Sequence, residues 1–272
     1  MCAFGRAYII ADDEHHLAIF CDYDRPGELV RIVADDLPNE KKARKRRKPD
    51  FEVLFRLPSD RSFHLGDGLV ALGSGSRSNR QTGVFIPLDG QGVPSKRVRR
   101  FDLVPLYRPL RAMLGDINIE GAVVIADDLL LLNRGITGRT DNATARYRLA
   151  DFAQLIEGEQ SDIEPLEIRR YHLGASEGVG LCFTDAAALP GGGWIFTAVA
   201  ENTNDSFADG PCVGSAVGWV NANGELHAIW PLTPPSKVEG VDVQDIDDGT
   251  LICLVTDSDE PRQSSTMWLA KL

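Results

Sequence analysis

Four glutamates recur along the chain at similar places in a repeated sequence pattern. Glu120, Glu177 and Glu239 each precede a Gly and an apolar segment, and Glu52 opens a weaker copy of the pattern. Neighbours in this series are 57 to 68 residues apart. Carboxylates that meet at low exposure raise one another's pKa and need a compensating cation, either a basic side chain or a metal ion. The repeat therefore predicts an acidic ring that contains such a cation.

Polar residues close the second apolar run of each copy, after a turn. In an antiparallel hairpin the start of the first strand lies beside the end of the second, so these polar residues should lie next to the glutamates. If the first strand is the innermost of its sheet, all of them converge on one mouth of a central channel. The residues that we expect there are Arg77, Asn133, Arg134, Glu201, Asn202 and Asp257.

Two interpretations of the acidic ring are open. Calcium suits it, because this ion accepts about six to eight oxygen ligands from carboxylates, amide carbonyls and water. Alternatively, each glutamate accepts hydrogen bonds from backbone amides of a neighbouring sheet, while the adjacent Gly lets the sheets approach closely. Recurrence in several copies favours this structural role. Under the calcium interpretation the metal ligands are Glu52, Glu120, Asn133, Glu177, Glu239 and Asp257.

The loop of residues 73–80, GSGSRSNR, is a second candidate for ligand binding. Gly and Ser leave backbone amides accessible, and two arginines can hold a phosphate or carboxylate. The loop lacks the lysine and the following helix of a P-loop, so nucleotide binding is not predicted. Catalytic residues remain unknown, and the predicted binding residues are Arg77, Arg80, Arg134 and Asn202.

The segments around the glutamates predict the fold. Pairs of runs rich in Val, Ile, Leu, Phe and Trp, separated by Gly and Asp turns, are typical of β-hairpins, and further short strand candidates follow each pair. Four antiparallel strands per repeated unit predict an all-β propeller of five blades in a single domain, residues 1–272. Six blades is the alternative, because the last unit, ending in MWLAKL, has only three strands. Helix is expected chiefly at Asp151–Glu159.

Composition and charge restrict the class of protein. The 272 residues are 43% hydrophobic and 25% charged, as in ordinary globular proteins. Seven of the 29 basic residues lie in the run Lys41–Lys48, which leaves 22 against 40 acidic residues elsewhere. The rest of the chain is strongly acidic and repels the phosphates of nucleic acids. Nucleic-acid partners are therefore not expected. We expect the basic run to be a solvated loop or a charge-protected edge strand, with a nucleic-acid or nuclear-localisation patch as the alternative.

The cysteines and the N-terminus bear on localisation. Five widely spaced cysteines are typical of reduced core thiols, which favours the cytoplasm. No apolar run approaches the roughly 20 residues of a membrane span, and the first ten residues do not form a signal-peptide pattern. The alternative is a periplasmic protein or lipoprotein whose leader has been removed, with Cys2 as the lipidated residue.

Several phrases of the sequence resemble known families. PDFEVL, LGSGSRSNRQTGV, NIEGAVV with LLLLNRG, and KVEGVDV with LVTDSD look like an uncharacterised family of bacterial β-propeller proteins. The resemblance runs from about Ala7 to the C-terminus and extends distantly to phytase esterase-like and SdiA-regulated-type propellers. Calcium-containing hydrolytic propellers of the lactonase and gluconolactonase group place Glu, Asn and Asp around calcium. Glu120, Asn133 and Asp257 match that pattern.

Two functions are consistent with these features. The first is a binding or scaffold propeller that presents the acidic ring and the loop of residues 76–80 to a small molecule or metal ion at the channel mouth. The second is a calcium-dependent hydrolase of an ester, lactone or phosphoester, in which the metal polarises the substrate and a ring carboxylate is the base. Calcium is a cofactor only under the second. The oligomeric state is left open.

Overall fold

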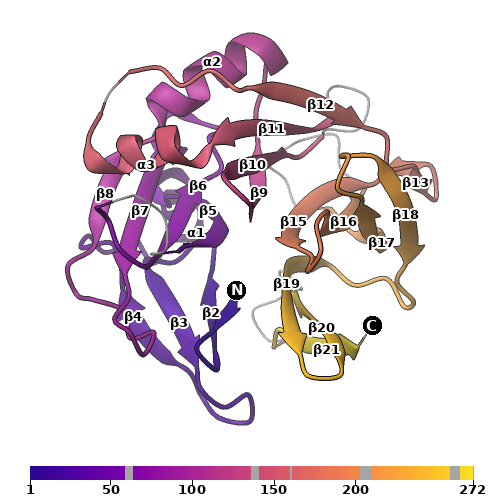
Figure 1. Ribbon diagram of the computed structural model, residues 1–272, viewed down its shortest axis with the longest axis horizontal. Helices are drawn as coiled ribbons and strands as arrows, with labels where there is room; N and C mark the ends of the chain where they lie inside the picture. Colours follow the sequence, from indigo (N-terminus) through magenta and orange to yellow (C-terminus); the bar gives the residue numbers. More distant parts are fainter. Residues whose placement is uncertain (59–63, 136–140, 160, 203–209, 258–263, 272) are drawn as a thin grey trace. The chain divides into compact units, whose positions relative to one another are not determined.

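A computed structural model describes residues 1–58, 64–135, 141–159, 161–202, 210–257 and 264–271 (Figure 1). The chain divides into two compact units. Unit 1 comprises Met1–Ile119, Asp127–Leu129 and Tyr147–Leu166, and unit 2 comprises Glu120–Ala126, Leu130–Arg146 and Glu167–Leu272. The expectation of a single domain stays a prediction.

The predicted all-β propeller with five antiparallel blades is confirmed. Two four-stranded sheets lie in unit 1: β1 (Cys2–Ala3), β2 (Arg6–Ile10), β3 (His16–Phe20) and β4 (Glu28–Arg31); and β5 (Phe51–Leu57), β6 (Gly68–Gly73), β7 (Thr82–Pro87) and β8 (Arg99–Asp102). A third contains β9 (Ile119–Ile125), β10 (Asp128–Asn133), β11 (Asn142–Arg148) and β12 (Glu167–Tyr171), with most of its residues in unit 2.

The remaining sheets belong to unit 2. One has four strands, β15 (Cys182–Ala188), β16 (Trp194–Glu201), β17 (Cys212–Val220) and β18 (Leu226–Pro231). The last has three described strands, β19 (Val238–Ile246), β20 (Gly249–Thr256) and β21 (Met267–Lys271), as its sequence predicts. A short extra hairpin joins β13 (Ala175–Ser176) to β14 (Val179–Gly180).

The helices lie in unit 1. The predicted helix at Asp151–Glu159 is confirmed as α3 (Leu149–Glu157), whose Phe152 packs against Phe55 and Phe101 with ring centroids 5.8 and 6.0 Å apart. The expectation for the basic run is wrong, because residues 41–47 form helix α1 (Lys41–Arg47) rather than a loop or strand. A 3-10 turn, η1 (Ser78–Arg80), and helix α2 (Val104–Leu114) complete the set. None of the helices in the described residues is long and apolar enough to span a bilayer.

The core of unit 2 holds an aromatic cluster. Phe183 on β15 contacts Tyr171, Trp194 and Phe196 with centroid separations of 5.0–5.9 Å. All four side chains are almost completely buried, and each adds a large apolar area that favours folding. All five cysteines carry free thiols, but only Cys182 and Cys253 are buried and Cys21 is exposed, so the expectation of core thiols holds for two of them.

A β-bulge recurs near the start of the first strand in three sheets. The pairing register shifts between Phe51 and Val53, between Phe183 and Asp185, and between Val238 and Gly240. The residues at the bulges are therefore Glu52, Thr184 and Glu239. A bulge interrupts the regular alternation of side chains between the two faces of a sheet. A polar residue at the bulge can therefore point away from both apolar faces.

The glycine after Glu120 is required by close packing between β9 and β15. A Cβ atom at Gly121 would lie 3.0 Å from Asp185 Cα and 3.2 Å from Ala186 N, both of them backbone atoms. We expect Gly121→Ala to lower the free energy of unfolding by about 1–3 kcal/mol, because overpacking forces the strands apart. The matched control is Gly240→Ala, whose Cβ would meet Val255 Cβ at an ordinary 3.6 Å. Equal urea-unfolding midpoints for the two variants would contradict this account of the Glu-Gly motif.

Candidate functional site

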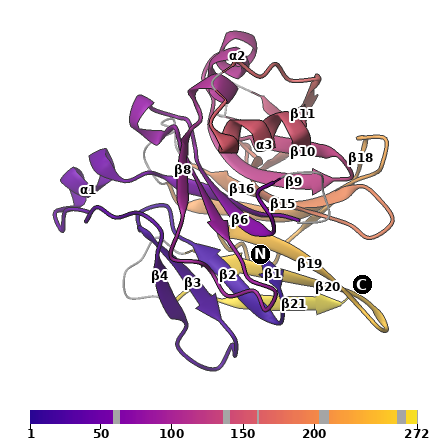
Figure 2. The same ribbon diagram turned by 60° about the vertical axis from the view of Figure 1, so that its left-hand side comes forward.

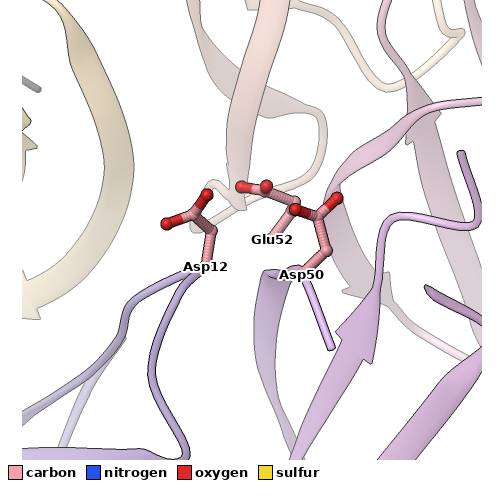
Figure 3. Close-up of side chains that lie close together, drawn as sticks. All are labelled: Asp12, Asp50 and Glu52. Atoms are coloured by element: carbon pink, nitrogen blue, oxygen red, sulfur yellow. The ribbon is translucent and has the colours of Figure 1, made fainter. Parts of the chain in front are cut away.

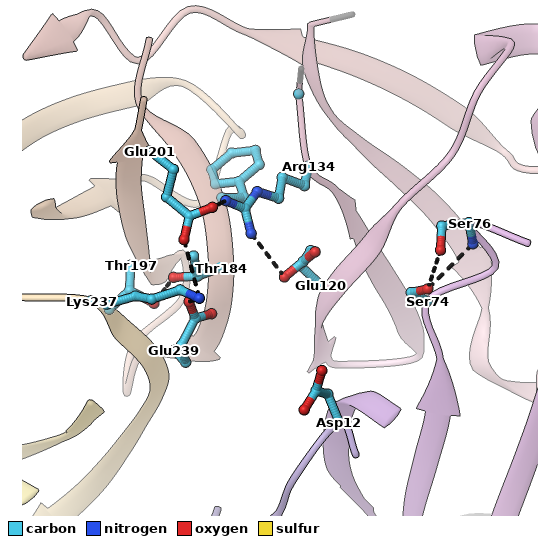
Figure 4. Close-up of polar contacts among 12 residues, drawn as sticks. Asp12, Ser74, Ser76, Glu120, Arg134, Thr184, Thr197, Glu201, Lys237 and Glu239 are labelled. Carbon is cyan, nitrogen blue, oxygen red and sulfur yellow. Dashed lines mark hydrogen bonds and ion pairs between the residues drawn. The ribbon is translucent and has the colours of Figure 1, made fainter. Parts of the chain in front are cut away.

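Five charged side chains of unit 2 form a chain of alternating charge (Figure 4). We call it the Arg134 network, and its members in order of contact are Glu120, Arg134, Glu201, Lys237 and Glu239. Glu120 and Glu239 are on the first strands of their sheets, β9 and β19; Arg134 follows β10, Glu201 ends β16, and Lys237 precedes β19. The network thus connects residues of three successive sheets.

Each cation of the network lies between two carboxylates. Arg134 Nη2 is 2.7 Å from Glu201 Oε2, and Arg134 Nη1 is 3.5 Å from Glu120 Oε2. Lys237 Nζ is 3.1 Å from Glu201 Oε1 and 3.5 Å from Glu239 Oε1. The side chains of Glu120 and Glu201 are only 6% and 8% exposed, so neither carboxylate can be ionised without these partners.

The pKa values of the network follow from burial and from this alternation. Burial opposes the charge on the Arg134 guanidinium, but Glu120, Glu201 and Glu239 outweigh it and raise the pKa of Arg134 further. Arg134 is therefore a permanent cation. At the other end, burial raises the pKa of Glu239 to about 8, against the attraction of Lys237 and Arg134. Glu239 is thus the member that takes up a proton near neutral pH.

The proton on Glu239 makes stability depend on pH. Its folded-state pKa of about 8 exceeds the ordinary 4.5, so its stabilising contribution is complete below pH 4.5 and disappears as the pH rises through 8. We expect the melting temperature of Glu239→Gln, relative to wild type, to rise between about pH 5 and pH 8.5. Thermal melts across this pH range measure the difference in melting temperature. Glu159→Gln, which removes an exposed carboxylate, is the control. A constant difference between Glu239→Gln and wild type would contradict the assignment.

Two further side chains connect β15 to β19. The Thr184 hydroxyl donates to the Val238 carbonyl (2.7 Å) and is hydrogen-bonded with the Thr197 hydroxyl (2.9 Å). The Asp185 carboxylate accepts from the Val241 amide (2.9 Å). Burial raises the pKa of Asp185 to about 7, against the effect of that amide. Thr184 thus occupies the bulge of this sheet and donates to the next sheet, while Asp185 accepts from a backbone amide of that sheet, as was expected of a glutamate.

A second group of charges, the Asp50 cluster, lies in unit 1. Asp50 accepts contacts from Lys48 Nζ (2.9 Å), Arg80 Nη1 (2.7 Å) and the Ser74 hydroxyl (2.6 Å). Lys48 also pairs with Asp12. Asp50, Lys48 and Arg80 are buried, and Asp12 and Asp50 outweigh the effect of burial to raise the pKa of Lys48.

Asp50 also belongs to a set of three acidic residues, the one set in the described part of the chain whose spacing resembles a metal site. Oxygens of Asp12, Asp50 and Glu52 all lie within 4.8 Å of one another (Figure 3). However, Lys48 and Arg80 already engage both oxygens of Asp50. In the Arg134 network, Arg134 and Lys237 similarly engage the carboxylates. Neither set of donors fits calcium well, because a bound ion would have to displace or approach a buried cation of the protein.

The other predicted site residues have different surroundings. Glu177 lies exposed in the β13–β14 turn with a positive φ of 51°, so its Glu-Gly pair precedes the sheet rather than opening it. Buried Asn133 donates to the Arg134 carbonyl at 3.3 Å. Arg77 is half-buried before η1. Asn202 and Asp257 are exposed, and their amides donate to the carbonyls of Pro211 and Lys237.

The structure brings the predicted residues together only in part. Glu120, Arg134 and Glu239 share the Arg134 network, while Arg80 and Glu52 adjoin Asp50. Sequence reasoning missed Lys237 and Lys48 as partners. Lys237 stands two residues before Glu239, and a cation so close to a glutamate in the sequence was the available signal. Lys48 was concealed within the basic run.

Two other features bear on catalysis. Residues 174–178, GASEG, match the Gly-x-Ser-x-Gly pattern of hydrolase nucleophiles, but they lie in the β13–β14 hairpin rather than between a strand and a helix. The hydroxyl of Ser176 donates to the Val213 carbonyl at 3.0 Å. Three histidines have described contacts: His15 with the Asp35 carbonyl, His16 with Glu14, and His227 with the ring of Trp219. None of these contacts activates a nucleophile.

Comparison with known proteins gives a family but no activity. No curated protein matches the chain. Among solved structures, Bombyx mori GH32 beta-fructofuranosidase in complex with sucrose is similar over 81% of this chain, with 10% identity and a TM-score of 0.37. The chain spans 46% of the length of that enzyme. A family model described as a family of unknown function, DUF6929, matches residues 3–272, and the chain belongs to this family.

Proposed function

We propose that this protein is a binding or scaffold propeller without catalytic turnover, and that its buried acidic residues hold sheets together rather than binding a metal. The observation that carries the proposal is the alternation of charge in the Arg134 network. Three carboxylates are interleaved with two cations supplied by the protein. A calcium site requires carboxylates whose charge is still to be compensated, and here the compensation is built into the chain.

The contacts between β15 and β19 support the same role. Where one sheet lacks a glutamate at the bulge, Thr184 takes its place and still bonds the next sheet. A hydroxyl is a weak calcium ligand but a good partner for a backbone carbonyl. Thr184 and Asp185, near the start of β15, thus connect two sheets through backbone groups, without the ligand chemistry of a metal site. The ligand of such a propeller is a small molecule or a partner protein.

Elemental analysis of the purified protein and thermal melts with EDTA or added calcium test the proposal. We expect no stoichiometric calcium and the same melting temperature in both conditions, because a ligand stabilises a protein only when it binds the folded state. The melting temperature of Glu120→Gln should likewise be the same in EDTA and in calcium. Stoichiometric calcium together with a higher melting temperature in calcium, lost in Glu120→Gln, would overturn the proposal and indicate the metal site of a hydrolase.

A calcium-dependent hydrolase is the second candidate, and the proximity of Asp12, Asp50 and Glu52 favours it. In that case Glu52→Gln should abolish both a calcium-induced rise in melting temperature and the hydrolysis of lactones, aryl esters or phosphoesters. Asp89→Asn, in an exposed loop of unit 1, is the matched control that removes one carboxylate elsewhere. Wild-type protein that shows neither calcium stabilisation nor turnover would eliminate this candidate.

A further inference from the structure

We propose that the outer side of helix α1 is a docking surface for a short acidic segment of a partner protein. The surface consists of Lys42, Arg46 and Arg47, which are all exposed, and we call it the α1 basic surface. It belongs to unit 1, and Figure 2 shows α1 standing apart from the sheets of that unit. The proposal is independent of the role of the Arg134 network in unit 2.

The helix is held in place by contacts at its N-terminus. The Glu40 side chain accepts hydrogen bonds from the amides of Lys42 (2.9 Å) and Ala43 (2.7 Å), which caps the first turn. Arg44 donates to the Asp13 carbonyl at 2.9 Å and pairs with Glu14. The short helix is therefore ordered by the β2–β3 turn on which it rests.

The C-terminal end of α1 is fixed equally well. Asn79 Nδ2 donates to the carbonyls of Arg46 (3.2 Å) and Lys48 (3.4 Å), which would otherwise be unsatisfied helix-end acceptors. The buried Lys48 side chain is held by Asp12 and Asp50. A helix fixed at both ends presents its exposed cations in a definite arrangement, which lowers the entropic cost of binding.

The two sides of α1 use their cations differently. Arg44 and Lys48, four residues apart, pair with carboxylates of the protein. Lys42 and Arg46 have the same spacing, and within the described part of the chain no carboxylate forms an ion pair with either of them or with Arg47. Like charges at this spacing repel each other.

Folding accounts for only part of this charge. Basic residues in the last turn of a helix are favourable, which explains Arg46 and Arg47, but Lys42 lies in the first turn, where a positive charge is unfavourable. The helix would thus be more stable without the cation of Lys42. A cluster that costs stability and lacks internal partners is best explained by an external anion.

The charge distribution selects the class of partner. A helix of seven residues is about 10 Å long, so its surface accommodates only a few anionic groups. Outside the run Lys41–Lys48 the chain has 22 basic and 40 acidic residues. A nucleic acid or an anionic membrane would bring further negative charge onto this acidic body, whereas a short acidic peptide confines its charge to α1. Arginine guanidinium groups also suit carboxylates, which they bind through two parallel hydrogen bonds.

Binding of fluorescently labelled hexaglutamate, measured by anisotropy at about 0.15 M salt with the full chain, tests the proposal. We expect saturable binding that weakens as salt increases, and a loss of roughly tenfold or more in affinity for Lys42→Glu/Arg46→Glu/Arg47→Glu. The matched control, Lys96→Glu/Arg97→Glu/Arg100→Glu, changes the net charge equally at exposed positions of unit 1 and should change the affinity less than about twofold.

Three results would overturn the proposal. The first is the absence of hexaglutamate binding to wild type at this salt concentration, and the second is an equal loss of affinity in both triple variants. The third is tighter binding of a DNA duplex or of phosphatidylserine vesicles than of the peptide, which would replace the protein partner with a nucleic acid or a membrane. Thermal melts of both variants confirm folding, and none of these results bears on the calcium test of the Arg134 network.

Discussion

Arg134→Met should be among the most destabilising single substitutions in unit 2, with an expected loss of about 3–5 kcal/mol in the free energy of unfolding. Methionine fills much of the volume of arginine but removes the guanidinium that contacts both Glu120 and Glu201. Both carboxylates are buried, and an uncompensated buried charge is far more costly than a lost surface contact. Urea unfolding of variant and wild type measures the difference.

The matched control for Arg134→Met is Arg108→Met. Arg108 also pairs with a carboxylate, that of Asp162, but its side chain is 65% exposed. An exposed ion pair contributes about 1 kcal/mol or less, so this substitution should have little effect. If the two variants lost the same stability, burial of the Arg134 network would have no energetic consequence and the account would be wrong.

Asp50→Asn should have the second large effect, again about 3–5 kcal/mol, in unit 1. The substitution leaves the buried cations of Lys48 and Arg80 without their shared carboxylate. Asparagine tolerates the positive φ of 58° at this position, so the backbone contributes little to the loss. Urea unfolding again provides the measurement.

Asp12→Asn is the control for Asp50→Asn, because it removes a carboxylate that contacts the same lysine. The Asp12 side chain is 40% exposed against 4% for Asp50, so we expect a loss of about 1 kcal/mol or less. A loss at Asp12 as large as that at Asp50 would contradict the view that Asp50 is the central residue of the cluster.

The sheets were predictable because their signals are local and repeated. Apolar runs separated by Gly and Asp turns specify hairpins, and repetition identifies the blades. Helix α2 was not predictable in this way, because VPLYRPLRAML contains two prolines, one of them inside the helix. Its stability depends on burial of Leu106 and Leu110 and on the hydrogen bond from the Tyr107 hydroxyl to the Gly73 carbonyl, contacts between segments far apart in the sequence.

The candidate site was predictable where the glutamate of the motif lies near the start of the first strand of a sheet. Glu239 lies at the bulge of β19, and Glu120 lies near the start of β9, both as expected. Ser176-Glu177-Gly178 also contains the Glu-Gly motif, but it belongs to the extra β13–β14 hairpin. In the sheet that follows, the bulge of β15 carries Thr184 instead of a glutamate. Strand register depends on pairing between strands, so the letters of one segment cannot reveal it. Lys48 is a related case, because its neighbours in the sequence are exposed cations and its burial depends on Asp12 and Asp50.

Neutralising Glu120 and Glu201 in the Arg134→Met background shows whether the Arg134 network is a self-compensated connection between sheets. The measurement is the free energy of unfolding of Arg134→Met/Glu120→Gln/Glu201→Gln compared with that of Arg134→Met alone. If the network is a self-compensated connection between sheets, neutralising both carboxylates should restore at least about half of the lost stability, because neutral amides avoid the cost of buried charge. A triple variant no more stable than Arg134→Met would show that the carboxylates are not destabilised by the loss of Arg134, and would contradict the account.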